Sequence, residues 1–214
     1  HHKVARAYVL YREQRAASRY HTKKLKEQIG VKVSSMMVMK RDGTKEPVSL
    51  DKITNRVSVL STGLEIDPIV VAQKAIPGLY SDITSAEIDN YLSETAAALT
   101  VEHPDYSYLA SRIKANALHK ETPGFLIATK NLFDDGLLKK TYYEKVIENS
   151  EDIESIIDYD RDYSFDYFAL TTLIRAYLLK FENKTIERPQ DLWMRVALTV
   201  SGDTFDLNKL KETY

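Results

Sequence analysis

The sequence predicts a mainly α-helical protein with a small β-sheet, and three observations support this fold class. Apolar residues recur at helical spacing over most of the 214 positions. Residues 36–48 instead hold two short extended runs on either side of an Asp-Gly pair, which is a strong hairpin signal because a type I′ turn needs positive φ at both central positions. Thr84-x-x-Glu87 has the sequence of a capping box, which begins a helix.

Composition and charge exclude several classes of protein. An apolar content of 43% and a charged content of 29% are ordinary for a globular protein, and a net charge of −1 argues against a general nucleic-acid binder. No apolar run approaches the roughly 20 residues that a membrane span needs, and no signal peptide is visible. The absence of cysteine excludes disulfides and cysteine-based zinc sites. We therefore expect a cytoplasmic protein with neither a membrane nor a direct nucleic-acid partner.

Charge is unevenly distributed along the chain. Residues 1–29 hold eight Lys or Arg and two Glu, and they begin with His1-His2, which is a tag remnant or native sequence. Residues 144–166 hold nine acidic and two basic residues. Such runs are usually solvated helix faces or surfaces that meet a partner.

Helix start and stop signals set the elements of the first half of the chain. From the N-terminus we expect a helix over 3–26, a linker over 29–35, hairpin strands over 36–39 and 45–48, and helices that begin near Ser49 or Asp51, at Asp67-Pro68, at Thr84 and at Asp105. Pro77 predicts a kink or an early stop in the second of these four helices.

The C-terminal part of the chain predicts further helices and a second hairpin. The expected elements are a helix from Thr122-Pro123 to Gly136, helices over 137–149, 152–157 and 167–174, hairpin strands over 177–181 and 185–187, a helix from Pro189 and a last helix from Thr204.

Three cations converge near the first predicted hairpin. Lys40 and Arg41 stand at the end of its first strand, and Lys52 lies in the first turn of the helix that follows it. Cations beside a helix N-terminus would suit a polyphosphate. The alternative is a charged hairpin on a solvated edge, and these three residues alone favour that alternative.

The alternating acids Asp158, Asp160 and Asp162 have a spacing that resembles a metal-binding loop. A calcium loop would also need a glycine near its middle and a late glutamate, and neither is present. We therefore predict no metal site here and an ion-pair network in a domain corner instead.

A series of motifs resembles the large subunit of ribonucleotide reductase. The opening of the ATP cone, the adenine-nucleotide module of that family, is similar to V-x-K-R-D-G-x-x-E and D-K-I-T, which here begin at Val38 and Asp51. The resemblance continues, in the family's order, through Gly78-Leu79-Tyr80, Glu94-Thr95-Ala96-Ala97, His103-Pro104-Asp105-Tyr106, Leu109-Ala110-x-Arg112, Leu118-His119-Lys120-Glu121, Tyr159-Asp160-Arg161-Asp162-Tyr163-Ser164 and Glu187-Arg188-Pro189-Gln190.

The resemblance implies the domain organisation. Residues 34–122 would form an ATP cone, a four-helix bundle capped by a small three-stranded sheet. Residues 123–214 would form the helical N-terminal part of the reductase barrel domain. Residues 1–30 would be a helix and linker, and that helix is either the tail of an upstream ATP cone or an unrelated amphipathic helix.

The resemblance also implies an ATP or dATP site, with Mg²⁺ accompanying the nucleotide. The nucleotide-binding residues would be Lys40, Arg41 and Lys120 at the phosphates, Glu46 and Lys52 beside them, Val38 and Ile53 against the base, and Ser85, Glu87 and Asp89 where the family reads adenine or ribose. Glu87 serves equally well as the acid of the capping box.

By the same resemblance, the chain would be the N-terminal allosteric part of a class I-type ribonucleoside-diphosphate reductase large subunit. ATP and dATP would regulate the activity and the assembly of that enzyme. Its partners would be the radical-generating small subunit and further large subunits. The family's chemistry needs cysteines, so we expect no catalytic residue in this segment. The alternatives are a stand-alone transcriptional regulator with an ATP cone and a helical scaffold without a ligand. The missing cysteines and the motifs over 159–190 argue against the transcriptional regulator.

Overall fold

The computed structural model describes residues 12, 20, 23, 36–202 and 204–214. The predicted helix over 3–26 and the linker over 29–35 lie outside the described residues, apart from the three isolated positions. The chain forms two compact units, His1–Ile113 and Lys114–Tyr214. This division falls inside a helix, and the boundary between residues 122 and 123 that the resemblance implies stays a prediction.

The first unit holds a three-stranded sheet in the order β2-β1-β3, with β1 at Met37–Met39, β2 at Lys45–Pro47 and β3 at Ile83–Thr84. Strands β1 and β2 form the predicted antiparallel hairpin, and Pro47 lies on the edge strand, where its missing N–H costs no sheet hydrogen bond. Strand β3 pairs in parallel with β1, with Val38 opposite Ile83.

The turn between β1 and β2 differs from the predicted type. Gly43 has a φ of +82°, but Asp42 does not have a positive φ. The Asp42 carboxylate instead accepts hydrogen bonds from the backbone N–H of Thr44 at 2.9 Å and from its hydroxyl at 2.6 Å. The prediction of a type I′ turn was wrong because this side chain stabilises a longer loop that needs only one left-handed residue.

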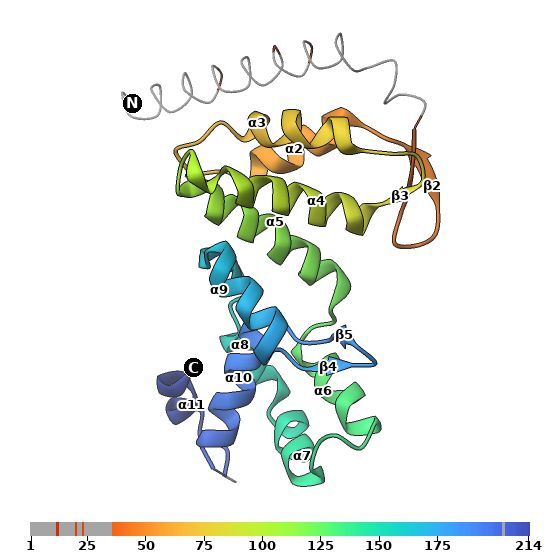
Figure 1. Ribbon diagram of the computed structural model, residues 1–214. Helices are drawn as coiled ribbons and strands as arrows, with labels where there is room; N and C mark the ends of the chain where they lie inside the picture. Colours follow the sequence, from red (N-terminus) through yellow and green to blue (C-terminus); the bar gives the residue numbers. More distant parts are fainter. Residues whose placement is uncertain (1–11, 13–19, 21–22, 24–35, 203) are drawn as a thin grey trace. The chain divides into compact units, whose positions relative to one another are not determined.

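Four α-helices complete the ATP-cone-like part of the chain, and the sheet lies at one end of them (Figure 1). They are α2 at Leu50–Leu60, α3 at Pro68–Ala75, α4 at Ser85–Ala98 and α5 at Asp105–Glu121, with short 3-10 helices η1 at Ile76–Gly78 and η2 at Leu99–Val101. The described core of the first unit consists of apolar residues on their facing sides, among them Val57, Val71, Ile76, Leu92, Leu109 and Ile113.

The predicted helix starts are largely confirmed. Ser49, rather than Asp51, caps α2, Asp67 caps α3, and Thr84 and Glu87 form both halves of the capping box of α4. Asp105 is not a cap but the first residue of α5, and its carboxylate accepts a hydrogen bond from the Glu65 N–H at 2.8 Å. Helix α3 stops just before Pro77, as predicted.

The second unit contains the C-terminal half of α5 and a set of short helices. These are α6 at Phe125–Asp134, α7 at Lys140–Glu148, α8 at Ser150–Ile156, η3 at Tyr159–Ser164, α9 at Tyr167–Thr172, the π-helix η4 at Leu173–Tyr177, α10 at Pro189–Val200 and α11 at Leu207–Thr213, with a hairpin of β4 at Lys180–Phe181 and β5 at Lys184–Thr185. Among the described residues, no helix has the length and apolar character needed to cross a membrane.

Several predicted boundaries in this unit were wrong. Helix α7 begins at Lys140 instead of Leu137, because the Leu137 N–H bonds back to the Leu132 carbonyl at the end of α6. Helix α11 begins at Leu207 instead of Thr204, because Asp206 is its N-cap. Helix α6 begins at Phe125 instead of Thr122, because the Thr122 hydroxyl bonds back to the Leu118 carbonyl at 2.7 Å and ends α5. The second hairpin begins at Lys180 instead of Tyr177, because residues 173–177 continue α9 as a π-helix. Its turn places Glu182 and Asn183 at positive φ.

A buried polar network, which we call the His119 junction, joins the end of α5 to η3 and α10. Asp162 is fully buried and accepts hydrogen bonds from Gln190 at 2.9 Å and from His119 at 2.7 Å. Asp191 accepts hydrogen bonds from the Tyr159 hydroxyl at 2.7 Å and from the Arg188 N–H at 2.8 Å. Asp162 of the acidic motif thus belongs to a buried hydrogen-bond network, whereas the ion-pair network that the sequence predicted for this motif stays a prediction.

The His119 junction predicts a pH dependence of stability. Burial raises the pKa of Asp191 from its ordinary value to about 6, although the hydrogen bonds from Tyr159 and Arg188 oppose the shift. Because the folded state binds this proton more tightly, the stability that it contributes is complete below pH about 4 and is lost as pH rises through about 6. We expect Asp191→Asn to flatten the pH dependence of unfolding between pH 4 and 7, by about 3 kcal/mol at most.

Urea unfolding, followed by the fluorescence of Trp193, the single tryptophan, would measure the free energy of unfolding of both proteins at each pH. Parallel curves for the wild type and Asp191→Asn across that pH range would contradict the assignment.

Candidate functional site

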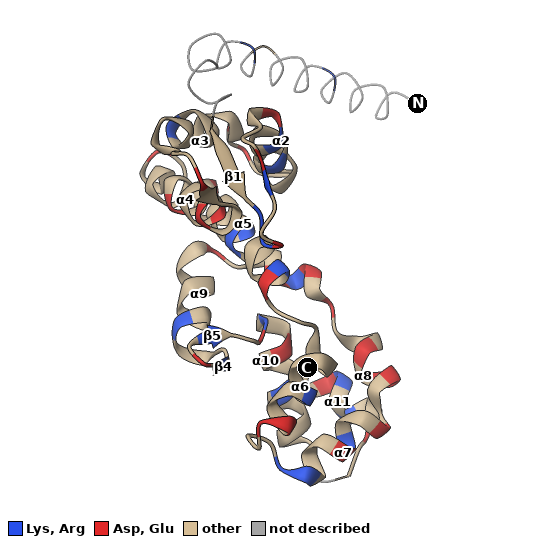
Figure 2. Ribbon diagram, turned by 90° about the vertical axis from the view of Figure 1, so that its right-hand side faces the viewer, with Lys and Arg blue, Asp and Glu red and all other residues tan. Residues whose placement is uncertain are grey.

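The predicted site residues of the first unit gather where β1, α2 and α4 meet. Lys40 and Arg41 directly follow β1, Lys52 lies in the first turn of α2, and Ser85 opens α4. Figure 2 shows the basic positions of this region on α2 and on the turn after β1. The local cause is the topology, because β2 runs directly into α2 and β3 runs directly into α4, which brings both helix N-termini to the sheet.

Glu46 holds two of the predicted cations. Its carboxylate lies 2.7 Å from the Lys40 Nζ and 2.9 Å from the Lys52 Nζ. The hydrogen bond to Glu46 raises the pKa of Lys40, and the hydrogen bonds from the two lysines lower the pKa of Glu46. Both lysine side chains remain largely exposed, so they are accessible to an anion from solution.

Asp89 holds two arginines. Its side chain is 0% exposed, whereas Arg41 is 30% and Arg56 is 25% exposed. The Arg41 Nη2 lies 3.1 Å from one carboxylate oxygen, and the Arg56 Nη1 pairs closely with the other. Arg41 also donates to the Ser85 hydroxyl at 3.4 Å. This carboxylate is closed to solvent, so it acts as a fixed internal anion that orients both guanidinium groups.

Glu87 performs the capping role. It accepts hydrogen bonds from the Thr84 N–H at 2.8 Å and from the Tyr80 hydroxyl at 3.1 Å. The bonds from Thr84 are the main cause of its lowered pKa. Of the two roles that the sequence left open, the capping box is confirmed, and a contact to a nucleotide stays a prediction.

The remaining predicted site residues are divided between the two compact units. Val38 and Ile53 are buried apolar residues on β1 and α2, within the same unit as the cations. Lys120 lies in the last turn of α5, in the part of that helix that belongs to the second unit. Its role at the phosphates stays a prediction.

Arg56 is the residue that the sequence reasoning missed. It lies four positions after Lys52 on α2, so helical spacing places both side chains on one face. This four-residue spacing from Lys52 is the feature of the sequence from which a role for Arg56 could have been predicted. The partner that fixes Arg56, Asp89, is 33 residues away, and only the tertiary fold, in which α3 packs against both α2 and α4, brings the two together.

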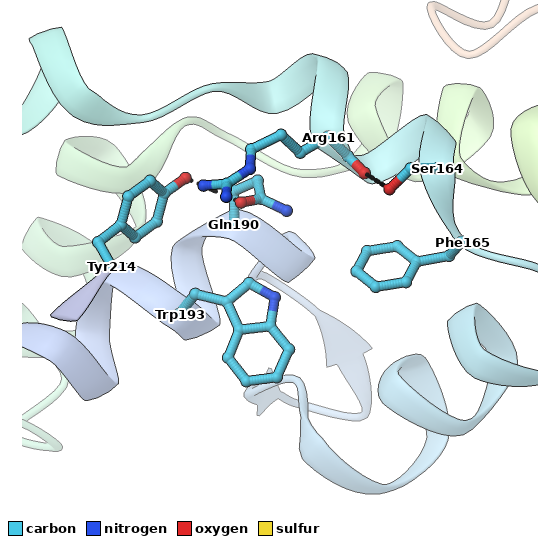
Figure 3. Close-up of a pocket in the computed structure, with 6 residues that line it drawn as sticks. All are labelled: Arg161, Ser164, Phe165, Gln190, Trp193 and Tyr214. Atoms are coloured by element: carbon cyan, nitrogen blue, oxygen red, sulfur yellow. Dashed lines mark hydrogen bonds between the residues drawn. The ribbon is translucent and has the colours of Figure 1, made fainter. Parts of the chain in front are cut away.

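A pocket of about 260 Å³ lies in the second unit and contains none of the predicted site residues (Figure 3). Its lining is Arg161, Ser164, Phe165, Gln190, Trp193 and Tyr214. The polar groups among them already bond to one another, since the Tyr214 hydroxyl donates to Gln190 at 2.8 Å and the Ser164 hydroxyl donates to the Arg161 carbonyl at 2.6 Å. We therefore do not assign the nucleotide to this pocket.

Comparison with known families assigns both regions of the chain. Residues 36–121 match the ATP cone domain, and residues 163–214 match the ribonucleotide reductase all-alpha domain. The ribonucleoside-diphosphate reductase large chain of Neurospora crassa is 42% identical over 84% of this chain and 20% of its own length. The large subunit of Dictyostelium discoideum is 42% identical over 86% of this chain and 23% of its own, and large chain 2 of Saccharomyces cerevisiae is 43% identical over 84% and 22%.

The cation-lined end of the sheet therefore belongs to an ATP cone, a module that binds adenine nucleotides. The resemblance to the large subunit of ribonucleotide reductase is confirmed, since the chain matches the ATP cone domain and the ribonucleotide reductase all-alpha domain and its relatives are large subunits of that enzyme. The chain spans between 20% and 23% of the length of the relatives described above.

The geometry of the Asp89 cluster predicts a stability effect. Asp89→Asn leaves two guanidinium groups facing a neutral amide, and removing one partner of a buried ion pair is strongly destabilising. Because both arginines are partly exposed, we expect a smaller loss of about 1–3 kcal/mol in the free energy of unfolding.

Urea unfolding followed by circular dichroism would measure the loss. The matched control is Glu102→Gln, because Glu102 pairs with Lys74 at 2.7 Å and both side chains are half-exposed. This control should cost less than about 0.5 kcal/mol. Equal losses in the two variants would show that Asp89 does not act as a buried counter-ion.

Proposed function

We propose that the first unit binds ATP or dATP, with the phosphates held by Lys40, Arg41 and Lys52. The observation that supports this most directly is that two carboxylates, Glu46 and Asp89, hold four cations at one end of the sheet. Four cations less two carboxylates leave a net charge of +2 there. A triphosphate is the anion whose size and charge suit such a cluster in an ATP cone.

The accessible cations favour an exchange of partners on binding. Lys40 and Lys52 now share one carboxylate, Glu46, and a phosphate oxygen can replace it because lysine forms charge-assisted hydrogen bonds to phosphate as well as to carboxylate. In contrast, the Asp89 carboxylate is out of reach of solvent and keeps its arginines. The lysines would thus close on the ligand while Arg41 is already oriented.

The rest of the nucleotide would lie against residues of the same unit. Val38 and Ile53 would lie next to the base, and Ser85 and Glu87 would lie near adenine and ribose. Asp89, whose carboxylate is closed to solvent, would act in that region through Arg41 and Arg56. Because the described residues contain no cluster of metal ligands, Mg²⁺ would be held mainly by the phosphates themselves.

We further propose that this nucleotide site regulates a ribonucleoside-diphosphate reductase. The large-subunit relatives carry that name, and the all-alpha match after the cone favours this reading over a stand-alone transcriptional regulator. The chain has no cysteine, so the catalytic cysteines would lie in other parts of the subunit. Its partners would be the small subunit and further copies of the large subunit, in the cytoplasm.

Binding of an adenine nucleotide should stabilise the protein. A ligand at about 100 times its dissociation constant stabilises the folded state by about 2.7 kcal/mol, which corresponds to a rise of roughly 5–10 °C in Tm for a chain of this size. Differential scanning fluorimetry with ATP and dATP measures this rise in Tm, and CTP serves as the control nucleotide. If both adenine nucleotides at millimolar concentration leave Tm unchanged, the proposal is wrong.

Loss of a phosphate contact should weaken binding. Charge-assisted contacts contribute about 1.5–3 kcal/mol, so Lys40→Ala and Arg41→Ala should each raise the Kd of ATP at least about tenfold. Isothermal titration calorimetry gives the Kd directly.

The matched control is Lys74→Ala. Lys74 is an exposed lysine of the same unit with a carboxylate partner, but that partner, Glu102, follows the C-terminal end of α4, whereas the proposed site lies at its N-terminal end. Lys145 would be a poor control, since its Nζ caps the C-terminal end of α10 through the carbonyls of Leu198 and Gly202. Unchanged affinity in Lys40→Ala and Arg41→Ala would move the phosphates elsewhere.

A further inference from the structure

Arg56 lies beside the proposed nucleotide site, and neither the family motif nor the proposed contacts give it a role. It stands on the second turn of α2, faces α4 and reaches the carboxylate of Asp89. Its guanidinium is 25% exposed, close to the 30% of Arg41, which reaches the same carboxylate from the end of β1. One buried anion therefore orients two arginines from two different elements.

The two arginines bind different oxygens of the Asp89 carboxylate. Arg56 occupies the Oδ1 of Asp89, and Arg41 occupies the Oδ2 through its Nη2 while its Nη1 points to Ser85. An arginine with free access to both oxygens of a carboxylate forms two parallel hydrogen bonds, which is the stronger arrangement. With Arg56 on Oδ1, the parallel arrangement would bring two guanidinium groups to the same oxygen, and the repulsion between their like charges opposes it.

We infer that Arg56 is a positioning residue that keeps Arg41 available to the phosphates of the nucleotide, an inference that rests on the proposed function. Without Arg56, Arg41 turns to bind both oxygens of Asp89, and its guanidinium is withdrawn from the ligand. The local charge also changes, because two arginines and one carboxylate leave a charge of +1, whereas Arg41 and Asp89 alone leave none. Both effects weaken the attraction for a phosphate.

The test is a double-mutant cycle on ATP affinity, measured by isothermal titration calorimetry with the full chain. Arg56→Ala should raise the Kd of ATP by about threefold to tenfold in the wild-type background. In the Arg41→Ala background the same change should have a clearly smaller effect, because the residue that Arg56 positions is gone and only the loss of charge remains. A purely structural role of Arg56 would instead give equal losses in both backgrounds.

Two further variants make the test independent of folding defects. Arg56→Lys keeps a cation on Oδ1 and should restore most of the affinity. If circular dichroism shows that Arg56→Ala does not fold, Arg56→Met takes its place, because methionine keeps the aliphatic stem and removes the donor. The same loss of affinity is expected for it.

Arg195→Ala is the matched control. Arg195 is 26% exposed and binds a buried carboxylate, Glu187, with its Nε at 2.6 Å, but it belongs to the second unit. Its removal should lower stability and leave the Kd of ATP unchanged.

The outcomes separate the two proposals. If the wild type binds ATP and Arg41→Ala weakens binding while Arg56→Ala equals the wild type, the positioning role of Arg56 is overturned and the nucleotide site stands. An equal loss for Arg56→Ala with and without Arg41 also overturns it. If the wild type does not bind ATP, the proposed function fails, and the role of Arg56 fails with it.

Discussion

The shared carboxylate of Asp89 is the constraint on which the architecture of the site depends. It is fully buried at the second turn of α4, where Arg41 pairs with it from the turn after β1 and Arg56 pairs with it from α2. The ion pairs thus fix the positions of three elements relative to one another. A buried ion pair adds little net stability compared with apolar packing, so its value here lies in orienting two cations toward the surface.

The Glu46 cluster has the opposite character. Glu46, Lys40 and Lys52 are all accessible to solvent, and ion pairs between exposed groups contribute little to stability. Such pairs open at low cost, which suits groups that must release one anion and accept another. The first unit therefore combines a fixed pair of arginines with an adjustable pair of lysines, and this combination is what the proposed exchange requires.

Helix α5 belongs to both compact units. Its first half packs Leu109 and Ile113 into the first unit, and its second half contributes Leu118 to a core cluster of the second unit and His119 to the junction with Asp162. The match to the ATP cone domain ends at residue 121, with the last residue of this helix. Lys120, a predicted phosphate contact, is thus covalently next to the residue that anchors the second unit.

Local signals in the sequence predicted most of the helices and the first hairpin. Capping residues such as Ser49, Asp67 and Thr84 act within three positions along the chain, so their effect is readable without tertiary structure. The two-residue strand β3 has no such signal, and its expectation came from the resemblance alone. The π-helix at residues 173–177 was missed because its cause is a continuation of α9 that no local pattern marks.

The candidate site could be predicted in part. The positions of Lys40, Arg41 and Lys52 followed from the hairpin and the helix start, whereas their carboxylate partners depend on strand pairing and on the packing of α3 against α2 and α4. Val38 lies opposite Glu46 in the β1–β2 register, and that register decides which face Glu46 presents to the lysines. Arg56 was missed for the same reason, because its partner is distant in sequence.

The central claim is that the nucleotide phosphates occupy the cation cluster at the end of the sheet. A crystal structure of the chain with bound ATP tests it most directly. The account predicts phosphate oxygens within hydrogen-bond distance of Lys40 and Arg41, at least one of the two Glu46–lysine pairs opened, and Asp89 still bound to both arginines. A nucleotide bound elsewhere, or phosphates bound with Arg41 turned away and both Glu46 pairs intact, would contradict it.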